Sequence, residues 1–379
     1  MAGDRSIGYH TEDMERTALE EILGELVAIP TVTSNVEANR QLIEYVRREL
    51  AKANMHIKIL RDGERDILVA TTRHTNSPEV LLVAHGDVVP ASDNALFKLR
   101  SDEHKLYGRG VLDMKFAIAA YMEVVKKLTA DLQSYDFGIA VTTDEEASNH
   151  NVVYLLEQGY SPKSVVLLDG GDAWQLESAA KGAWTVKLTV HGRGAHGSQP
   201  WAGDSASFKL LSLLDEIKAL FAEHKPHTDT LNISMLAAGQ AVNQIPDKAS
   251  AVLDVRVVNE ASLRRLQQKI GSICDRYNAE QAVSALLPPL EHDLSNHYLQ
   301  TFAEVTQEVT GQLSAPMLSY GASEAAHFKQ RNIPCVVTAP AGGGRHGDDE
   351  WVSRQSLNFA VPILVNYLRA VAHIGAKKQ

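Results

Sequence analysis

Three short apolar runs in the first half of the chain limit its possible folds more than any other feature. They are Val80–Ala84, Ile139–Thr143 and Val165–Leu168. Each run is too short for a buried helix and lacks the polar alternation of a half-exposed strand, which is typical of a strand covered on both faces. A segment with helical periodicity, Lys115–Leu128, separates the first two runs. This alternation predicts an α/β domain built on a largely parallel sheet.

A different pattern begins after Lys181-Gly182 and suggests an inserted module. Its strands and helices follow in the order β-α-β-β-α-β, which is that of a ferredoxin-like fold. The expected elements are Trp184–Val190, a helix from Ser205 to about Glu223, Asn232–Leu236, Ala249–Val258, the helix Ala261–Tyr277, and Ala282–Leu287. Afterwards α/β features resume with the helix Asn296–Thr310, the strand Pro334–Ala339 and a closing helix from Ser356 to about Ile374. We therefore expect residues 1–182 and 291–379 to form one catalytic domain and 183–290 a domain inserted into it.

Charge and cysteine content exclude several classes of partner and site. The chain has 37 Lys and Arg against 47 Asp and Glu, a net charge of −10, so no basic excess exists to neutralise the phosphates of nucleic acid or an anionic membrane. No apolar run approaches the roughly 20 residues of a membrane helix, and the first residues lack the apolar stretch of a signal peptide. With only Cys274 and Cys335, the expected location is the cytoplasm, and any metal site must use His, Asp and Glu.

Ionisable residues follow the predicted buried strands at the points where the strands end. The set is His85, Asp87, Asp144, Glu145, Glu146, Asp169 and His346, with Asp113 on a further segment. Taken singly, such an Asp is usually a helix cap or turn residue and such a His a surface residue. However, the carboxyl ends of parallel strands line one crevice, where so many carboxylates would repel each other unless cations were bound. The joint pattern predicts a pair of divalent cations, with zinc suited to the ligand set and cobalt or manganese possible.

Five stretches of the chain resemble a known family. They are LLVAHGDVVP, LYGRGVLDMK, TTDEEAS, LLDGGDAWQLE and GGGRHGDDEW. They resemble, in order and over nearly the whole chain, the metallopeptidase family of acetylornithine deacetylase, succinyl-diaminopimelate desuccinylase, carboxypeptidase G and aminotripeptidase. The resemblance implies a zinc-exopeptidase-like three-layer α/β catalytic domain with an inserted ferredoxin-like α+β domain that serves as a lid or in dimerisation. It also implies two Zn²⁺ ions and a homodimer formed through the inserted domain.

The resemblance assigns a metal-binding role to five residues. His85 and Asp169 would bind one metal, Glu146 and His346 would bind the other, and Asp113 would bridge both. Asp169 stands in a DGG context that is similar to the tripeptidase branch of the family, whereas deacetylase relatives often carry Glu-Pro there.

Further roles are implied beside the ligands. Asp87 would orient the imidazole of His85, Glu145 would be the catalytic base, and a cis peptide would follow Asp113. Asp172 remains an alternative to Asp169 as a ligand.

The inserted domain carries three further candidates. The stretch HGRGAHGSQP resembles the family segment that places a His over the active site, often from a partner subunit, so His196 would stabilise the oxyanion. Without the family, a turn His on a Gly-rich loop is the simpler interpretation. Asn243 and Arg256 would contact the oxyanion or the substrate carboxylate, although Arg256 could instead form an ion pair with Asp254.

The expected activity is metal-dependent hydrolysis of an amide or peptide bond in a small substrate with a free carboxylate, an N-acyl amino acid or a dipeptide. A close alternative is an aminopeptidase acting on di- or tripeptides. A non-catalytic binding protein on the same fold would have lost a ligand or Glu145, and neither is lost. A nucleotide-binding protein would need Lys and Ser or Thr after a Gly-rich loop, whereas Gly342–Gly344 is followed by Arg345 and His346.

Overall fold

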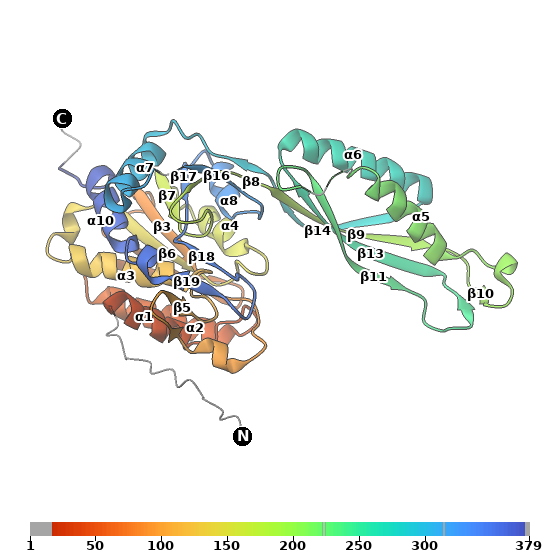
Figure 1. Ribbon diagram of the computed structural model, residues 1–379, viewed down its shortest axis with the longest axis horizontal. Helices are drawn as coiled ribbons and strands as arrows, with labels where there is room; N and C mark the ends of the chain where they lie inside the picture. The colour runs from red at the N-terminus through yellow and green to blue at the C-terminus, as the bar shows by residue number, and fades with distance from the viewer. Residues whose placement is uncertain (1–16, 222, 224, 314, 376–379) are drawn as a thin grey trace, which may run out of the picture. The chain divides into compact units, whose positions relative to one another are not determined.

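The computed structural model describes residues 17–375 except 222, 224 and 314. The chain divides into two compact units, with boundaries at 176/177, 294/295, 315/316 and 332/333 (Figure 1). The inserted unit therefore starts earlier and ends later than 183–290 and also takes the segment 316–332. This happens because β8 (Leu176–Ala180) lies between β15 (Leu290–Glu291) and β16 (Pro316–Ser319) in a small sheet. Strands of two to five residues carry too little pattern for the sequence to reveal this pairing.

The first unit is built on a six-stranded mixed sheet of order β1-β2-β6-β3-β7-β17. Its strands are β1 (His56–Asp62), β2 (Arg65–Thr71), β3 (Val80–His85), β6 (Phe137–Thr142), β7 (Ser164–Leu167) and β17 (Cys335–Val337). Strands β6, β3, β7 and β17 run parallel, and every residue of β3, β6 and β7 is buried. The predicted buried strands are thus confirmed. The antiparallel hairpin β1-β2, which pairs with β6, was not predicted.

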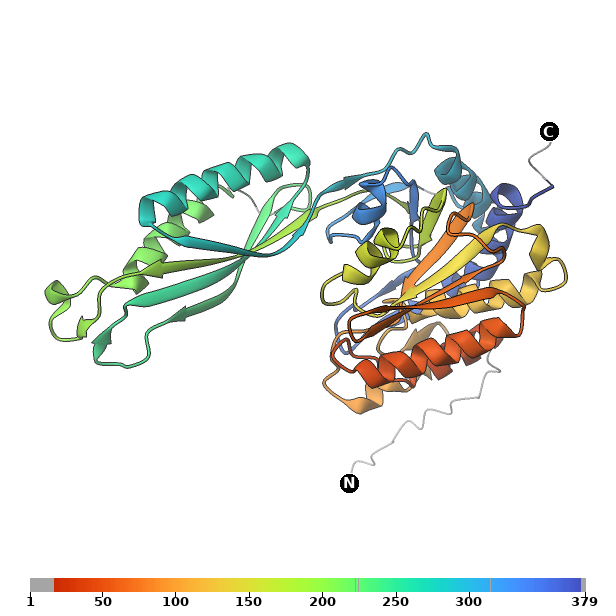
Figure 2. The same cartoon turned by 180° about the vertical axis from the view of Figure 1, so that it is seen from behind.

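Helices cover the sheet in the layers expected of an α/β fold (Figure 2). Helix α2 (Val36–Ala51) packs on β2, α3 (Lys115–Leu128) on β3, and α7 (His297–Thr310) on β17. Helix α1 (Ala18–Val27) and helix α10 (Ala360–Val371) both pack against α3. Within the described residues, no helix combines the length and apolar character needed to cross a bilayer.

The closing helix predicted from Ser356 is in fact two helices, α9 (Arg354–Leu357) and α10. Pro362 explains the break. It has no N–H to donate to the carbonyl of Asn358 four residues earlier, and its ring would clash with that carbonyl. The chain therefore ends α9 and starts α10, which places Pro362 in the first turn, where no N–H is needed.

A four-stranded sheet of order β18-β19-β5-β4 brings two distant parts of the first unit together. Strands β4 (Arg100–Ser101) and β5 (Lys105–Tyr107) precede the loop that carries Asp113. Strands β18 (Gly342–Gly343) and β19 (Trp351–Ser353) flank the loop that carries His346. Because β19 pairs with β5, the strand at which the His346 loop ends lies beside the strand from which the Asp113 loop starts.

The second unit contains the predicted ferredoxin-like module. Its elements are β9 (Gly182–His191), α5 (Ala206–Lys218), β11 (Thr230–Ala238), β13 (Lys248–Val257), α6 (Glu260–Tyr277) and β14 (Glu280–Leu287). The strand order is β11-β13-β9-β14, and all neighbours are antiparallel. Alternate residues of β13, among them Ala251, Leu253 and Val255, are buried in the core that the sheet forms with α5 and α6.

A buried ion pair within the first unit gives a test of its stability. The Arg354 guanidinium contacts both carboxylate oxygens of Glu20 on α1, at 2.7 and 2.8 Å, and Glu20 is only 1% exposed. Arg354→Met should lower the free energy of unfolding by about 3 kcal/mol, because it leaves a buried carboxylate without its partner. Denaturant unfolding measures the change. The double variant Arg354→Met/Glu20→Met should regain much of the loss, and a single-variant loss below about 1 kcal/mol would contradict the assignment.

Candidate metal centre

The ends of neighbouring parallel strands bring the predicted ligands to one edge of the sheet. His85 is the last residue of β3, Glu145 and Glu146 follow β6, and Asp169 follows β7. Strand β3 lies between β6 and β7, so these side chains start from adjacent positions. These candidate ligands therefore lie at the ends of the strands that were expected to carry them.

Two triads of potential ligand atoms share one carboxylate. In the first, His85 Nε2 lies 3.1 Å from Asp113 Oδ1 and 3.7 Å from Asp169 Oδ2. In the second, His346 Nε2 lies 3.2 Å from Asp113 Oδ2 and 3.1 Å from Glu146 Oε2. Each oxygen of Asp113 thus faces a different imidazole, which is the arrangement of a carboxylate that bridges two cations. These five side chains, with His, Asp and Glu donors, fit a pair of zinc ions.

The alternative ligand Asp172 belongs to neither triad. Its side chain is exposed, two residues before the buried Trp174, whereas Asp169 is partly buried beside His85. Of the two candidates, the structure therefore brings Asp169 to the other potential ligands.

The imidazoles and carboxylates of this centre shift each other's pKa values. Burial alone would lower the pKa of His85, but its hydrogen bond to Asp113 and the charges of Glu145, Asp113 and Asp169 raise that pKa well above its usual value. Burial likewise opposes ionisation of Asp113, yet hydrogen bonds from His346 and His85 hold its pKa well below the usual range. Hydrogen bonds to Asp113 and Glu146 raise the pKa of His346 to about 10. The carboxylates of the centre therefore stabilise a positive charge there, whether on an imidazole or on a metal ion.

Asp87 positions two parts of the centre at once. His85 Nδ1 lies 2.9 Å from the Asp87 backbone oxygen but 3.6 Å from its carboxylate, so the carbonyl accepts the Nδ1 proton and leaves Nε2 as the ligand atom. The carboxylate of Asp87 instead accepts the backbone N–H of Glu145 at 3.1 Å and of Glu146 at 3.2 Å, and the Thr33 hydroxyl at 2.8 Å. That the Asp87 carboxylate holds the backbone of Glu145 and Glu146 was not predicted from the sequence.

Glu350 fixes the backbone that carries Asp113, a role that was not predicted from the sequence. Its buried carboxylate accepts the N–H groups of Gly110, Leu112 and Asp113 at 2.9, 2.9 and 3.1 Å, and Arg109 Nη1 at 3.1 Å. Glu350 lies within the stretch GGGRHGDDEW, which was the available signal. The peptide between Asp113 and the next residue is cis, as the family resemblance implied.

The loop between β18 and β19 sends consecutive side chains to different triads. Gly344 and His346 both have positive φ, 72° and 62°, a conformation that is uncommon for a residue other than glycine. The Arg345 guanidinium pairs with Asp169 of the first triad, while His346 pairs with Glu146 of the second. This contact of Arg345 was not predicted from the sequence.

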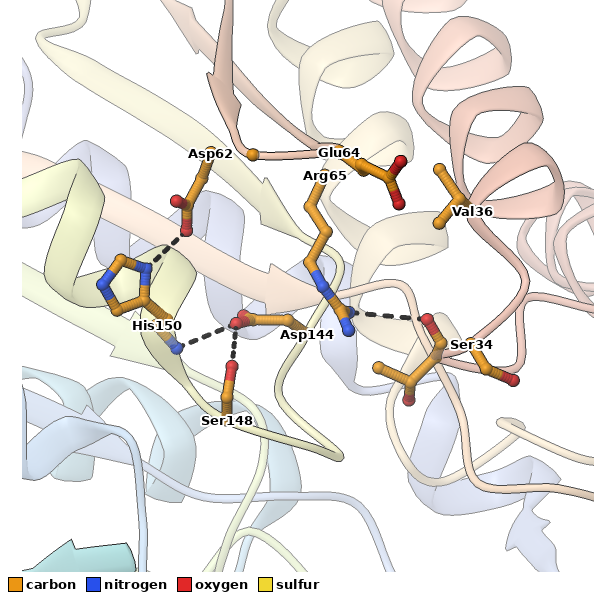
Figure 3. A pocket seen from close by; sticks show the side chains of 10 residues that line it. Ser34, Val36, Asp62, Glu64, Arg65, Asp144, Ser148 and His150 are labelled. Atoms are coloured by element: carbon orange, nitrogen blue, oxygen red, sulfur yellow. Dashed lines mark hydrogen bonds and ion pairs between the residues drawn. The ribbon is translucent and has the colours of Figure 1, made fainter. Parts of the chain in front are cut away.

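A separate cavity of about 480 Å³ is lined by residues that include Asp62, Asp144, Ser148 and His150 (Figure 3). Asp144 accepts the Ser148 hydroxyl at 2.6 Å and the backbone N–H of His150 at 2.8 Å, so it shapes the turn and is in neither triad. The His150 imidazole lies 2.6 Å from Asp62 on β1, and this hydrogen bond raises the pKa of His150. His150 therefore ties α4 (His150–Glu157) to the β1-β2 hairpin.

The second unit brings together two of its three candidate residues. His196 lies on β10 (Ala195–His196), and its Nδ1 accepts the backbone N–H of Ser198 at 3.2 Å, which leaves Nε2 as a proton donor. The carbonyl of Asn243 accepts the N–H of Gly197 at 2.7 Å, so Asn243 adjoins His196.

Arg256 lies elsewhere in the second unit, near the opposite end of β13. It contacts Asp254 at 2.8 and 3.3 Å, the ion pair that the sequence had left as an alternative.

Comparison with known proteins gives one family over most of the chain. The pattern described as Peptidase family M20/M25/M40 matches residues 81–370. The chain is 29% identical over 382 residues to a succinyl-diaminopimelate desuccinylase of Stutzerimonas stutzeri, covering 92% of this chain and 97% of that protein. A protein of the same name from Ectopseudomonas mendocina is 27% identical over 375 residues, covering 90% and 95%.

Solved structures show the same fold at lower identity. A tripeptidase from Staphylococcus aureus superposes with a TM-score of 0.78 at 18% identity, covering 93% of this chain and 98% of the other. An M20 family metallo-carboxypeptidase from Sulfolobus solfataricus gives a TM-score of 0.76 at 15% identity, covering 94% and 99%.

Zinc binding at pH 7 should release protons. A pKa of about 10 keeps His346 protonated at this pH, the pKa of His85 is raised as well, and an imidazole must be neutral to bind metal. We therefore expect release of at least about one proton per protein, and an apparent zinc affinity that rises as the pH approaches the His346 pKa of about 10. Calorimetric titration of chelator-treated protein in two buffers of different ionisation enthalpy measures the number. His346→Ala should release about one proton fewer, and zinc uptake without proton release would contradict the prediction.

Proposed function

Since the chain belongs to peptidase family M20/M25/M40 and is a hydrolase of amide or peptide bonds, we propose that it uses two zinc ions to cleave such a bond in a small substrate with a free carboxylate. The observation that carries the proposal is Asp113, whose two oxygens face the imidazoles of two separate triads. His85, Asp113 and Asp169 would hold one ion, and Asp113, Glu146 and His346 the other. Cobalt or manganese would be substitutes.

The bound metals would lower the pKa of a water molecule and polarise the scissile carbonyl. Glu145 is the residue we assign to proton transfer. It is next to the ligand Glu146, its backbone N–H is held by Asp87, and its charge is close enough to raise the pKa of His85. In the proposed reaction Glu145 takes the proton of the attacking water and gives it to the leaving nitrogen.

His196 and Asn243 are the groups we propose for the oxyanion. With Nδ1 accepting from Ser198, the exposed imidazole of His196 presents an Nε2 proton, which is the donor that a tetrahedral oxyanion needs. Asn243 is exposed beside it and can add an amide donor. Arg256 is our candidate for the substrate carboxylate, and it would have to exchange its contact with Asp254 for that role.

The substrate we propose is an N-acyl amino acid or a dipeptide. Relatives named succinyl-diaminopimelate desuccinylase cover nearly the whole chain, which favours the N-acyl class. The alternative, an aminopeptidase on di- or tripeptides, is favoured by the DGG context of Asp169. A non-catalytic role would leave the retention of Glu145 and of all five potential ligands without a reason. A cytoplasmic location stays a prediction from the sequence.

A hydrolysis screen paired with metal analysis tests this function. The wild-type protein should hold two zinc ions and cleave members of a panel of N-acetyl amino acids, N-succinyl amino acids and dipeptides, and it should lose activity after chelation. Glu145→Gln should keep both ions and lose at least about a thousandfold in kcat, because general base catalysis is removed while the ligands stay. Activity that survives exhaustive chelation would sink the proposal.

We further propose that the protein is a homodimer formed through its second unit. Large apolar side chains are exposed on two neighbouring elements of this unit: Phe208 (72%) and Leu211 (55%) on α5, and Met235 (66%) and Leu236 (60%) on β11. Strand β11 is also an edge of the four-stranded sheet, so its outer hydrogen-bonding groups can pair with another chain. An exposed apolar surface beside an open edge is typical of an interface between copies.

Light scattering measures this association directly. The wild-type protein should show twice the chain mass of 41.4 kDa, and Phe208→Glu/Met235→Glu should shift it toward a single chain. Leu313→Glu removes an equally exposed apolar side chain (76%) from the first unit and should leave the mass unchanged. A monomeric wild type would refute the dimer and would require His196 to act within its own chain.

A further inference from the structure

Arg345 directly precedes the proposed ligand His346 and contacts another proposed ligand, Asp169. No other cationic residue in the described part of the chain does both. The Nη1 of Arg345 pairs with Asp169 Oδ1 and lies 4.0 Å from Asp113 Oδ1. The two oxygens of Asp169 therefore have different neighbours. Oδ1 faces the guanidinium, while Oδ2 faces His85 Nε2 at 3.7 Å.

We propose that Arg345 is a positioning residue that makes Asp169 bind the first metal through one oxygen, Oδ2. This proposal rests on the proposed metal-dependent function. An Asp carboxylate that nothing holds can turn about its last bond and present either oxygen, or both, to a cation. A guanidinium on Oδ1 removes that freedom, because turning the carboxylate would break a charge-assisted hydrogen bond.

The loop that carries Arg345 is itself held in place. Gly347 N–H donates to the Gly344 carbonyl at 2.8 Å, which closes a turn around Arg345 and His346. Arg109 donates to the carbonyl of Gly347 at 2.7 Å and to that of His346 at 3.4 Å. The guanidinium of Arg345 thus starts from a backbone fixed by other residues, as a positioning group requires.

The charge of Arg345 and its proposed positioning role predict opposite effects on metal affinity when Arg345 is removed. A cation 4.0 Å from Asp113 repels a metal ion, so if its charge were all that mattered, removal would tighten metal binding. If Arg345 holds Asp169 in place, removal weakens binding at the first site. Only Nη1 makes the contact, and Nη2 is buried without a hydrogen-bond partner among the described residues. A lysine could therefore supply the charge and much of the single contact.

The experiment compares Arg345→Met, Arg345→Lys and Arg369→Met, the last being an exposed arginine on α10 that gives the same change in net charge. Zinc dissociation constants are measured at pH 7 by competition with a chromophoric chelator. Arg345→Met should weaken one of the two sites about tenfold or more, Arg345→Lys should restore most of the loss, and Arg369→Met should match the wild type. The visible spectrum of the cobalt-substituted protein should lose intensity in Arg345→Met, as Asp169 gains a second metal contact.

The outcomes separate this inference from the proposed function. Tighter or unchanged zinc binding in Arg345→Met, or equal weakening of both sites, would overturn the role of Arg345 while the wild type still holds two ions and hydrolyses substrate. A wild type that binds no zinc would overturn the proposed function itself. Circular dichroism of each variant verifies that it is folded, and Arg345→Gln, for which the same weakening of one site is expected, replaces the Met variant if that variant does not fold.

Discussion

Both halves of the candidate centre depend on the position of one carboxylate, Asp113. Its two oxygens face His85 and His346, so neither triad exists without it. Its own position depends on Glu350, which accepts the Asp113 N–H and two neighbouring N–H groups. Glu350 is held in turn by pairing of β19 with β5, which joins a late segment of the chain to an early one. The centre therefore forms only when the first unit is fully assembled.

Carboxylates perform two different tasks around this centre, and hydrogen bonding decides which. Asp87, Asp144 and Glu350 accept backbone N–H groups, so they are fixed anchors that shape the turns. Both oxygens of Asp113 and Oδ2 of Asp169 face imidazoles, so these oxygens are directed into the triads. Residue type alone does not separate the two tasks. The difference lies in whether the carboxylate oxygens already accept hydrogen bonds from backbone N–H groups.

The sequence predicted the main buried strands and named candidate ligands, but it did not reveal the contacts that position them. Fully apolar runs such as Val80–Ala84 identified the parallel strands, because burial on both faces leaves a pattern in consecutive residues. The candidate ligands could be named because several motifs resembled one family, and the structure brings them together in two triads. By contrast, two of the positioning contacts join residues far apart in sequence. They are the hydrogen bond from the Asp113 N–H to Glu350 and the contact of Arg345 with Asp169. Such hydrogen bonds follow no spacing rule, so only the assembled fold shows them.

The charge of the centre connects its structure to the kind of substrate we propose. Asp113, Asp169, Glu146 and Glu145 bring four negative charges, which two divalent cations would cancel when bound as proposed. Arg345, partly exposed beside Asp169, then adds a positive charge next to the proposed first metal. A site of this kind favours an anionic substrate even on a chain whose net charge is −10, because local charge outweighs distant charge screened by salt. The free carboxylate of an N-acyl amino acid or a dipeptide meets that condition.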